Sequence, residues 1–437
     1  MKQIPTYFKS DSRSVRSMLF IGYRAFVLFV TCFFAAMPLL NSCQNVINTT
    51  DTTFFDEFGK CKEKNQVLTE AQPKDVKFFV EVSGSMNGFF RSGQATGFKH
   101  DVWSVVTDFV GTDGSVNVFT TQGTDAEALP VNVFREGMNR GAFVSSSSTN
   151  VPDMISRMLD TVNVKDSEVG VLISDLKYDP VGNAAMNVLL DQYSTDVRNI
   201  MMRHPGVAVG LIAAKSAYLN KDCEVVTDAS PYYYLVVGKQ ENVVFMRNFI
   251  STLLKHNGSF VDEMEWGIDY LSPSIAVTDC DYLTKIDENK SYGSFEDECT
   301  LLLSIDITNY PWLYESKDSL AKYLTVKSNE GTEAQFDFKK TGYEITYDNG
   351  KSLKRTAHVK VPLVISNMYE ESDIFEISLK CPEVQMPNEA FCRFLNSNDV
   401  NEVTTSFSMI NLLRGFYSSM QRFKESKPVH ILISKNQ

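Results

Sequence analysis

The sequence predicts two folded domains: an α/β domain on a doubly wound, mostly parallel sheet, followed by a β-rich, sandwich-like domain. Near-continuous apolar runs of strand length, such as residues 75–82 and 168–174, are typical of strands buried on both faces. Segments with apolar residues at helical spacing separate these runs, and such alternation favours a parallel sheet. After Asn257 the alternation stops, and short predicted strands are separated by turn residues. These two patterns give the predicted division into residues 75–257 and 258–437.

The composition excludes some classes of protein. The chain has 437 residues, of which 43% are hydrophobic and 22% charged, as in folded proteins. It carries 42 basic and 54 acidic side chains, for a net charge of −12. Nonspecific binding to nucleic acid depends on neutralising phosphates, so we expect no nucleic-acid partner. The five histidines form no H-E-x-x-H or H-x-H pattern, so we expect no histidine-built zinc site.

The first 42 residues are predicted to be a targeting signal. Residues 1–24 carry five basic side chains against one acid, residues 25–40 carry no charge, and residues 40–43 read LNSC. A basic start, an apolar run and a small residue before the cut describe a secretory signal. The segment resembles a bacterial lipoprotein signal, in which Leu stands three residues before a cysteine that becomes lipidated. The resemblance implies that Cys43 carries the lipid and anchors the protein to the membrane.

An uncleaved membrane anchor is the alternative interpretation of the same segment. Residues 18–40 are long enough to span a bilayer if Arg24 reaches back to the interface. Both interpretations leave the remainder outside the cytoplasm, so we expect a membrane-anchored protein of the cell envelope, facing the periplasm or the cell surface. Residues 43–74 are rich in Asn, Thr, Asp, Glu and Lys and are expected to form a tether.

In residues 75–257, predicted strands and helices follow each other along the chain. The strands are expected at residues 75–82, 116–120, 169–173, 207–213 and 232–237, and the helices at 98–109, 151–159, 186–200 and 243–254. Ligands of such sheets bind beyond the carboxyl ends of the strands. The polar residues that follow the buried strands are therefore the candidates for function.

Oxygen-bearing side chains stand at three of these positions. The first strand ends in Glu81 and is followed by Ser83 and Ser85, Thr149 precedes the helix predicted from residue 151, and Asp175 follows the strand at 169–173. Hydroxyls and carboxylates without imidazole or thiolate suit a hard cation such as magnesium or calcium. A coordination position left open by the protein could accept a carboxylate from another molecule.

The order of these residues resembles the von Willebrand factor A domain. The metal-ion-dependent adhesion site of that family reads Asp-x-Ser-Gly-Ser after the first strand, with a Thr in a later loop and an Asp after the fourth strand. Ser83, Ser85, Thr149 and Asp175 match this pattern, whereas Glu81 replaces the first Asp. The resemblance implies Mg²⁺ or Mn²⁺ on the three hydroxyls, with Glu81 and Asp175 acting through bound waters. It also implies a protein partner that offers an Asp or a Glu.

Each of these residues also has a purely structural interpretation. Ser83 and Ser85 suit a turn that caps the next helix. Thr149 can serve as a helix N-cap, and Asp175 as a solvated loop acid. The longer side chain of Glu81 displaces its carboxylate from the position that the family's Asp would take, and this leaves a weakened site or a metal-free one as alternatives.

Residues 258–437 are predicted to form an antiparallel sandwich that a helix interrupts. Strands are expected at residues 301–307, 334–338, 344–347, 358–365, 374–379 and 429–433, and the helix within 403–420. The cysteines other than Cys43 have irregular spacings, so disulfides and free thiols both remain open. The pairs nearest in sequence are Cys280 with Cys299 and Cys381 with Cys392.

Three functions compete for this sequence. The first is a cell-envelope lipoprotein whose A-like domain binds a protein partner, with a divalent cation as a candidate bridge. The second is a metal-free structural scaffold of an envelope complex. The third is a metal-dependent hydrolase acting through Glu81 and Asp175. No G-x-S-x-G motif surrounds Ser83 or Ser85, so we expect a binding protein and not an enzyme.

Overall fold

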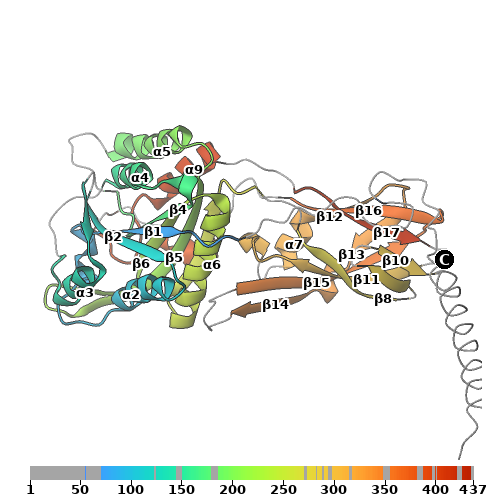
Figure 1. The fold of residues 1–437 in the computed structure, drawn as a ribbon, viewed down its shortest axis with the longest axis horizontal. Coiled ribbons are helices and arrows are strands. Elements are labelled where there is room, and N and C mark those ends of the chain that lie inside the picture. Colours follow the sequence, from blue (N-terminus) through green and yellow to red (C-terminus); the bar gives the residue numbers. More distant parts are fainter. Residues whose placement is uncertain are drawn as a thin grey trace, which may run out of the picture.

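The computed structural model describes residues 55, 70–122, 125–143, 150–178, 186–269, 273–281, 283–287, 290–293, 298–313, 317–347, 355–380, 387–395, 399, 401–420 and 426–434. These residues form an α/β part and a β-rich part, which follow each other along the long axis of the molecule (Figure 1). The expectation of an α/β domain followed by β-rich structure is confirmed at this level.

A seven-stranded sheet in the order β3-β2-β1-β4-β6-β5-β7 forms the centre of the α/β part. Its strands are β1 (Asp75–Glu81), β2 (Ser115–Gln122), β3 (Asp125–Leu129), β4 (Glu168–Ser174), β5 (Ala208–Leu219), β6 (Val225–Gly238) and β7 (Phe260–Trp266). β1 pairs in parallel with β2 and β4, and the other neighbouring pairs of this sheet are antiparallel. The sheet is therefore mixed, and the prediction of a mostly parallel sheet is wrong.

The reversal comes mainly from β5 and β6, which form a hairpin. Residues 220–224 connect the two strands, and so short a connection cannot make the crossover that parallel strands require. β6 pairs antiparallel with both β5 and β4. The apolar pattern located both strands, but it carried no information about their direction.

The predicted boundary after Asn257 is also wrong for the sheet. Gly258 ends helix α6 with a φ of +79°, a conformation that glycine adopts without strain. The chain turns back there, and β7 pairs antiparallel with β5. Further along, α9 (Met409–Met420) shares a hydrophobic core with α5 and the sheet. A helix assigned to the second domain thus belongs to the first.

Helices cover both faces of the seven-stranded sheet (Figure 1). On one face lie α2 (Gly97–Val110), α3 (Val131–Arg140) and α6 (Gln240–Asn257), and on the other α4 (Val151–Thr161), α5 (Met186–Arg203) and α9. Alternate residues of β1 point to opposite faces: Phe78 and Val80 pack with α2 and α6, and Phe79 packs with α4 and α5. By this alternation Glu81 belongs to the face that α4 and α5 cover.

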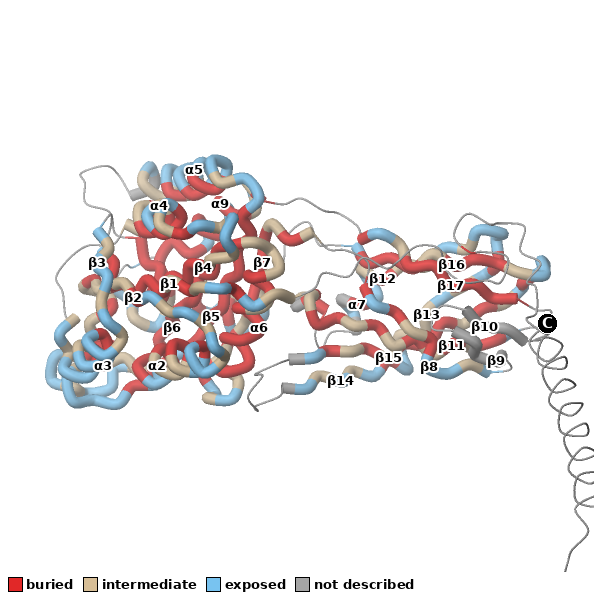
Figure 2. Tube along the Cα trace, in the orientation of Figure 1, coloured by how far each residue is buried: buried red, intermediate tan, exposed pale blue. Residues whose placement is uncertain are grey.

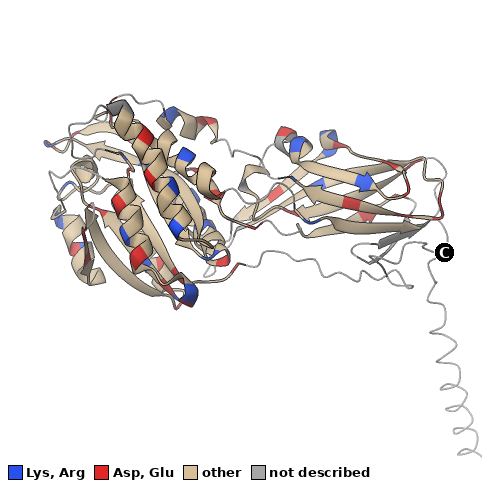
Figure 3. Ribbon diagram, turned by 90° about the horizontal axis from the view of Figure 1, so that it is seen from above, with Lys and Arg blue, Asp and Glu red and all other residues tan. Residues whose placement is uncertain are grey.

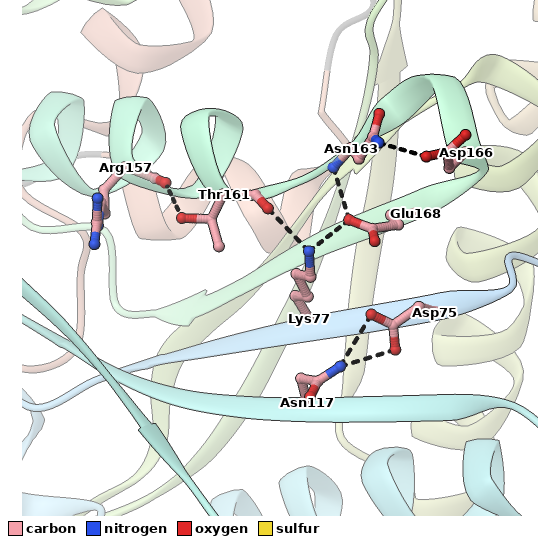
Figure 4. A network of polar contacts seen from close by, with 8 residues as sticks. All are labelled: Asp75, Lys77, Asn117, Arg157, Thr161, Asn163, Asp166 and Glu168. Carbon is pink, nitrogen blue, oxygen red and sulfur yellow. Dashed lines mark hydrogen bonds and ion pairs between the residues drawn. The ribbon is translucent and has the colours of Figure 1, made fainter.

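A polar network joins β1 to the start of β4 at the amino-terminal edge of the sheet (Figure 4). The Lys77 ammonium donates to the Thr161 carbonyl at 2.9 Å and forms an ion pair with Glu168. Glu168 also accepts a hydrogen bond of 2.7 Å from the backbone amide of Asn163. These contacts tie the α4–β4 connection to β1 and fix the parallel register between the two strands.

Two further sheets form the β-rich part, in the orders β12-β16-β17-β10-β9 and β13-β15-β11-β8, with β14 paired to β15. The strands are β8 (Ile275–Cys280), β9 (Leu283–Asp287), β10 (Lys290–Gly293), β11 (Glu298–Asp306), β12 (Leu324–Ser328), β13 (Glu333–Phe336), β14 (Gly342–Tyr347), β15 (Arg355–Ser366), β16 (Ser372–Leu379) and β17 (Val429–Ser434). Both sheets contribute residues to one buried core, as in a sandwich, and Figure 2 shows buried positions along the strands of both sheets. The pairs are antiparallel except for β10 with β17.

Helices are short in the β-rich part and in the segment that returns from it. They are α7 (Lys317–Tyr323), α8 (Glu389–Cys392) and the 3-10 turns η3 (Pro311–Leu313), η4 (Phe338–Lys340) and η5 (Arg393–Leu395). In the described part of the chain, Cys223, Cys299 and Cys392 form no disulfide. Burial raises the pKa of Cys299 to about 12, so this thiol behaves as a small apolar side chain. Cys381 lies outside the described residues.

Candidate functional site

The candidate site lies at the carboxyl ends of β1 and β4, where the winding of the chain changes direction. From β1 the chain proceeds to β2 on one side, and β4 later joins β1 on the other side in parallel. Such a switch point leaves a crevice beyond the strand ends, where open α/β sheets bind ligands. Ser83 and Ser85 follow β1, and Asp175 follows β4. The topology therefore brings three of the predicted residues to one place.

Hydrogen bonds link these three side chains. The Ser83 and Ser85 hydroxyl oxygens lie 2.9 Å apart, and the Ser85 hydroxyl donates to the Asp175 carboxylate. Ser83 is 1% exposed and Asp175 is 2% exposed. A solvated loop acid would be open to water, so that structural interpretation of Asp175 is wrong. Two hydroxyls and one carboxylate form a compact set of oxygen donors.

Burial controls the ionisation of Asp175. Desolvation raises the pKa of this carboxyl above its usual value. The charge of Lys177 and hydrogen bonds from the Lys177 amide, at 3.3 Å, and from Ser85 act in the opposite direction but do not cancel the effect of burial. A carboxylate left short of positive charge in a buried place is stabilised by any cation that enters. The pKa of Asp175 is thus consistent with a cation site.

Glu81 lies beside Ser174 at the same edge. The Ser174 hydroxyl donates to the Glu81 carboxylate, accepts a 2.7 Å hydrogen bond from the Leu176 amide, and is itself buried. Glu81 has no exposed surface; burial is the largest cause of the raised pKa of Tyr193 on α5, followed by Tyr178 and then by the charge of Glu81. The longer acid thus points toward the α4–α5 layer. Its expected role through metal-bound waters stays a prediction.

Thr149 and Cys43 lie outside the described residues, so the structure places neither. Within the described ranges, no group of three or more His, Cys, Asp or Glu side chains is arranged to hold a metal ion. A site made of two hydroxyls and one carboxylate is a different class of site from such clusters. The fit to a hard cation therefore depends on Ser83, Ser85 and Asp175.

Tyr218 on β5 is a site residue that the sequence did not reveal. Its hydroxyl donates to the Ser85 carbonyl at 3.0 Å and so holds the 3-10 turn η1 (Ser85–Gly88) that carries the serine. Gly88 permits this contact, because a Cβ at that position would lie 2.4 Å from the Tyr218 ring. The Gly at position 88 is a visible signal of close approach, but no sequence pattern names Tyr218 as the neighbour.

The return segment, residues 402–406, was also missed. It leads into α9 and lies against the strand ends next to Asp175. The Lys177 ammonium donates to the Glu402 carbonyl at 2.6 Å, and the Ser230 hydroxyl donates to the Val403 carbonyl at 2.6 Å. Tyr233, which pairs with Ser174, has its hydroxyl 2.7 Å from that of Ser406. The return segment therefore lies against the residues that follow β4 and the neighbouring part of β6.

Comparison with known proteins adds no identification. Neither the family models, the curated proteins nor the solved structures gave a match to this chain. Among the described residues, no helix combines the length and the apolar character needed to cross a membrane.

Proposed function

We propose that this protein is a cell-envelope lipoprotein, anchored to the membrane through Cys43, whose α/β part binds a protein partner. In this proposal the α/β part is a domain like the von Willebrand factor A domain with a variant adhesion site. The partner offers an Asp or a Glu, and the protein is not an enzyme. The partner binds at the carboxyl ends of β1 and β4, and the β-rich part supports the α/β part structurally.

One observation supports this proposal more than any other. Ser83, Ser85 and Asp175 lie together at the switch point of the sheet, with an acid whose pKa burial raises. Hydroxyl ligands carry no charge, so a divalent ion bound there keeps attraction for a further carboxylate. These three residues, with Thr149 and Glu81 as expected additions, would hold Mg²⁺ or Mn²⁺. When bound, the ion would supply a coordination position for the carboxylate of the partner.

Calorimetric titration of the protein with magnesium and manganese tests this function. We expect binding at millimolar metal and a rise in the midpoint of thermal unfolding. Ser85→Ala should weaken binding at least about tenfold by removing a ligand, and Glu81→Asp should tighten it by restoring the shorter acid of the family. Ser104→Ala, a partly exposed serine on α2, is the matched control and should change nothing.

A metal-free scaffold is the second candidate, and the contacts of Glu81 favour it. A buried carboxylate that accepts from Ser174 and acts electrostatically on Tyr193 of α5 contributes to the packing of the sheet without any ion. The two candidates differ in one result. Capture of the partner from envelope extract should be lost in EDTA only if a cation links the partner to this protein. If neither the native chain nor Glu81→Asp shows heat of metal binding or thermal stabilisation by metal, the metal-free scaffold remains as the function.

A further inference from the structure

A cavity lies away from the strand ends, beside helices α5 and α9 of the α/β part. It has a volume of about 590 Å³ and is bordered by α5, α9 and the segment from Pro387 to Leu395. A cavity of this size is in the range of sites for small organic ligands. None of Ser83, Ser85 and Asp175 lines it, so it is separate from the proposed cation site.

The walls of this cavity are mainly apolar. Helix α9 contributes Ile410, Leu413 and Tyr417 to the lining at helical spacing, and Pro387 and Leu395 also line the cavity. Ile410 is 46% exposed, although the same stripe of α9 is buried elsewhere against α5. When an apolar ligand covers an apolar stripe that borders a cavity, the free energy of the system falls.

Close packing of the two helices holds the cavity open. A Cβ at Gly415 would lie 2.7 Å from Val197, so α9 approaches α5 more closely than a larger residue would permit. Nearby, the Asn411 amide donates to the Leu190 carbonyl at 2.6 Å. Because these contacts fix the two helices that line the cavity, a ligand would enter a site that already exists.

Two arginines give this cavity its charge. Arg198 of α5 and Arg414 of α9 line it, and among the described residues that line it none is acidic. Elsewhere, basic and acidic side chains are interspersed along the helices (Figure 3), and the exposed Arg140 and Arg393 pair with Glu136 and Glu389. Within the described part of the chain, Arg198 and Arg414 form no such ion pair. In an acidic protein, two unpaired guanidinium groups at an apolar cavity point to an anionic ligand.

We propose that this cavity binds a single-chain amphipathic carboxylate of the fatty-acid class. The acyl chain would cover Ile410, Leu413 and Leu395, and the carboxylate would meet Arg198 and Arg414. Guanidinium groups bind carboxylates through paired N–H donors, which gives both strength and orientation. The volume suits one chain of moderate length better than a lipid with two chains.

Titration of the intact protein with decanoate tests the role of the arginines. We expect a Kd below about 100 µM and at least tenfold weaker binding of the uncharged methyl decanoate. Replacing both arginines, Arg198→Gln with Arg414→Gln, should weaken decanoate binding by a similar factor. Arg157→Gln, an exposed arginine on α4, is the matched control and should leave the Kd unchanged.

A second pair of variants tests the apolar wall. Ile410→Asp places a charge on the wall and should abolish binding, whereas Met202→Asp, at a residue 64% exposed on α5 outside the cavity, should not. Absence of binding by decanoate, or equal binding of acid and methyl ester in native and double-variant protein, would overturn the proposal. An apolar peptide with a free carboxyl terminus that binds more tightly than decanoate would assign the cavity to a protein ligand instead. Magnesium binding at the strand ends is independent of every one of these outcomes.

Discussion

The two ends of the parallel strand pair β1–β4, called here the amino-terminal and the carboxyl edge, place acidic side chains in opposite electrostatic surroundings. At the amino-terminal edge, desolvation of Glu168 is outweighed by hydrogen bonds from Lys77 and the Asn163 amide and by the charge of Lys77, so the pKa of Glu168 is lowered. At the carboxyl edge, desolvation of Asp175 outweighs the charge of Lys177 and the hydrogen bonds it accepts, so its pKa is raised.

The two acids differ both in burial and in partner: Glu168 is partly exposed and paired with Lys77, whereas Asp175 is buried and accepts hydrogen bonds mainly from neutral groups. At the first edge the chain supplies its own cation at hydrogen-bonding distance, and the pair serves the fold (Figure 4). At the second edge the ammonium of Lys177 donates to the Glu402 carbonyl, and hydroxyls surround the acid. An acid left short of positive charge is unfavourable for the fold alone and favourable for a bound cation.

The largest effect is expected from breaking the amino-terminal edge. Lys77→Met leaves Glu168 partly buried beside an apolar side chain, and we expect the free energy of unfolding to fall by about 2 kcal/mol. Lys360→Met is the control, because Lys360 and Glu344 form a 2.6 Å pair whose side chains are 40% and 57% exposed. There we expect a loss below about 0.5 kcal/mol. Urea unfolding measures both losses, from the transition of the α/β part for Lys77→Met and from that of the β-rich part for Lys360→Met. Equal losses in the two variants would contradict the comparison.

A change of opposite sign is expected at the carboxyl edge. Asp175→Asn removes the buried charge while keeping an oxygen for the Lys177 amide, so in EDTA at pH 8 we expect stability to rise by roughly 1 kcal/mol. The same variant should lose any stabilisation by magnesium. Asp108→Asn, an exposed acid on α2, should change neither quantity. A variant less stable than the native chain in EDTA would show that the Asp175 charge serves the fold.

The sequence predicted those parts of the site that depend on local pattern. Apolar runs located β1 and β4, and the rule for strand ends brought Ser83, Ser85 and Asp175 together. The sequence did not predict that the Glu81 side chain points toward the α4–α5 layer, because that depends on the face of the sheet on which the last residue of β1 lies. The burial of Asp175 was missed for a related reason, since neighbours from other elements enclose it.

Pairing between distant segments was the other source of error. The apolar runs found β5 and β6 but not that they form a hairpin, and nothing in the sequence assigned β7 to the first sheet. The return segment lies more than 200 positions after Asp175, and its contacts with Lys177 and Ser230 use backbone carbonyls, which every residue has. Such contacts leave no mark in the side-chain pattern.

The smallest effect is a pH dependence that has opposite signs at the two edges. The folded state lowers the pKa of Glu168, so its contribution to stability is present above the usual Glu pKa of about 4.3 and is lost as the pH falls through the folded value. The folded state raises the pKa of Asp175. Its contribution is present below the usual Asp pKa of about 3.9 and is lost as the pH rises through the raised value.

Both signs can be measured against neutral variants in EDTA between pH 4 and 8. Relative to the native chain, Glu168→Gln should become less stable as the pH rises, by less than about 1 kcal/mol because its side chain is partly exposed. Asp175→Asn should become more stable over the same range. Each difference should be smallest at pH 4, where the native acids are closest to being protonated in both the folded and the unfolded state. Slopes of the same sign would mean that both acids are paired within the fold, and the carboxyl edge would then need no cation from outside.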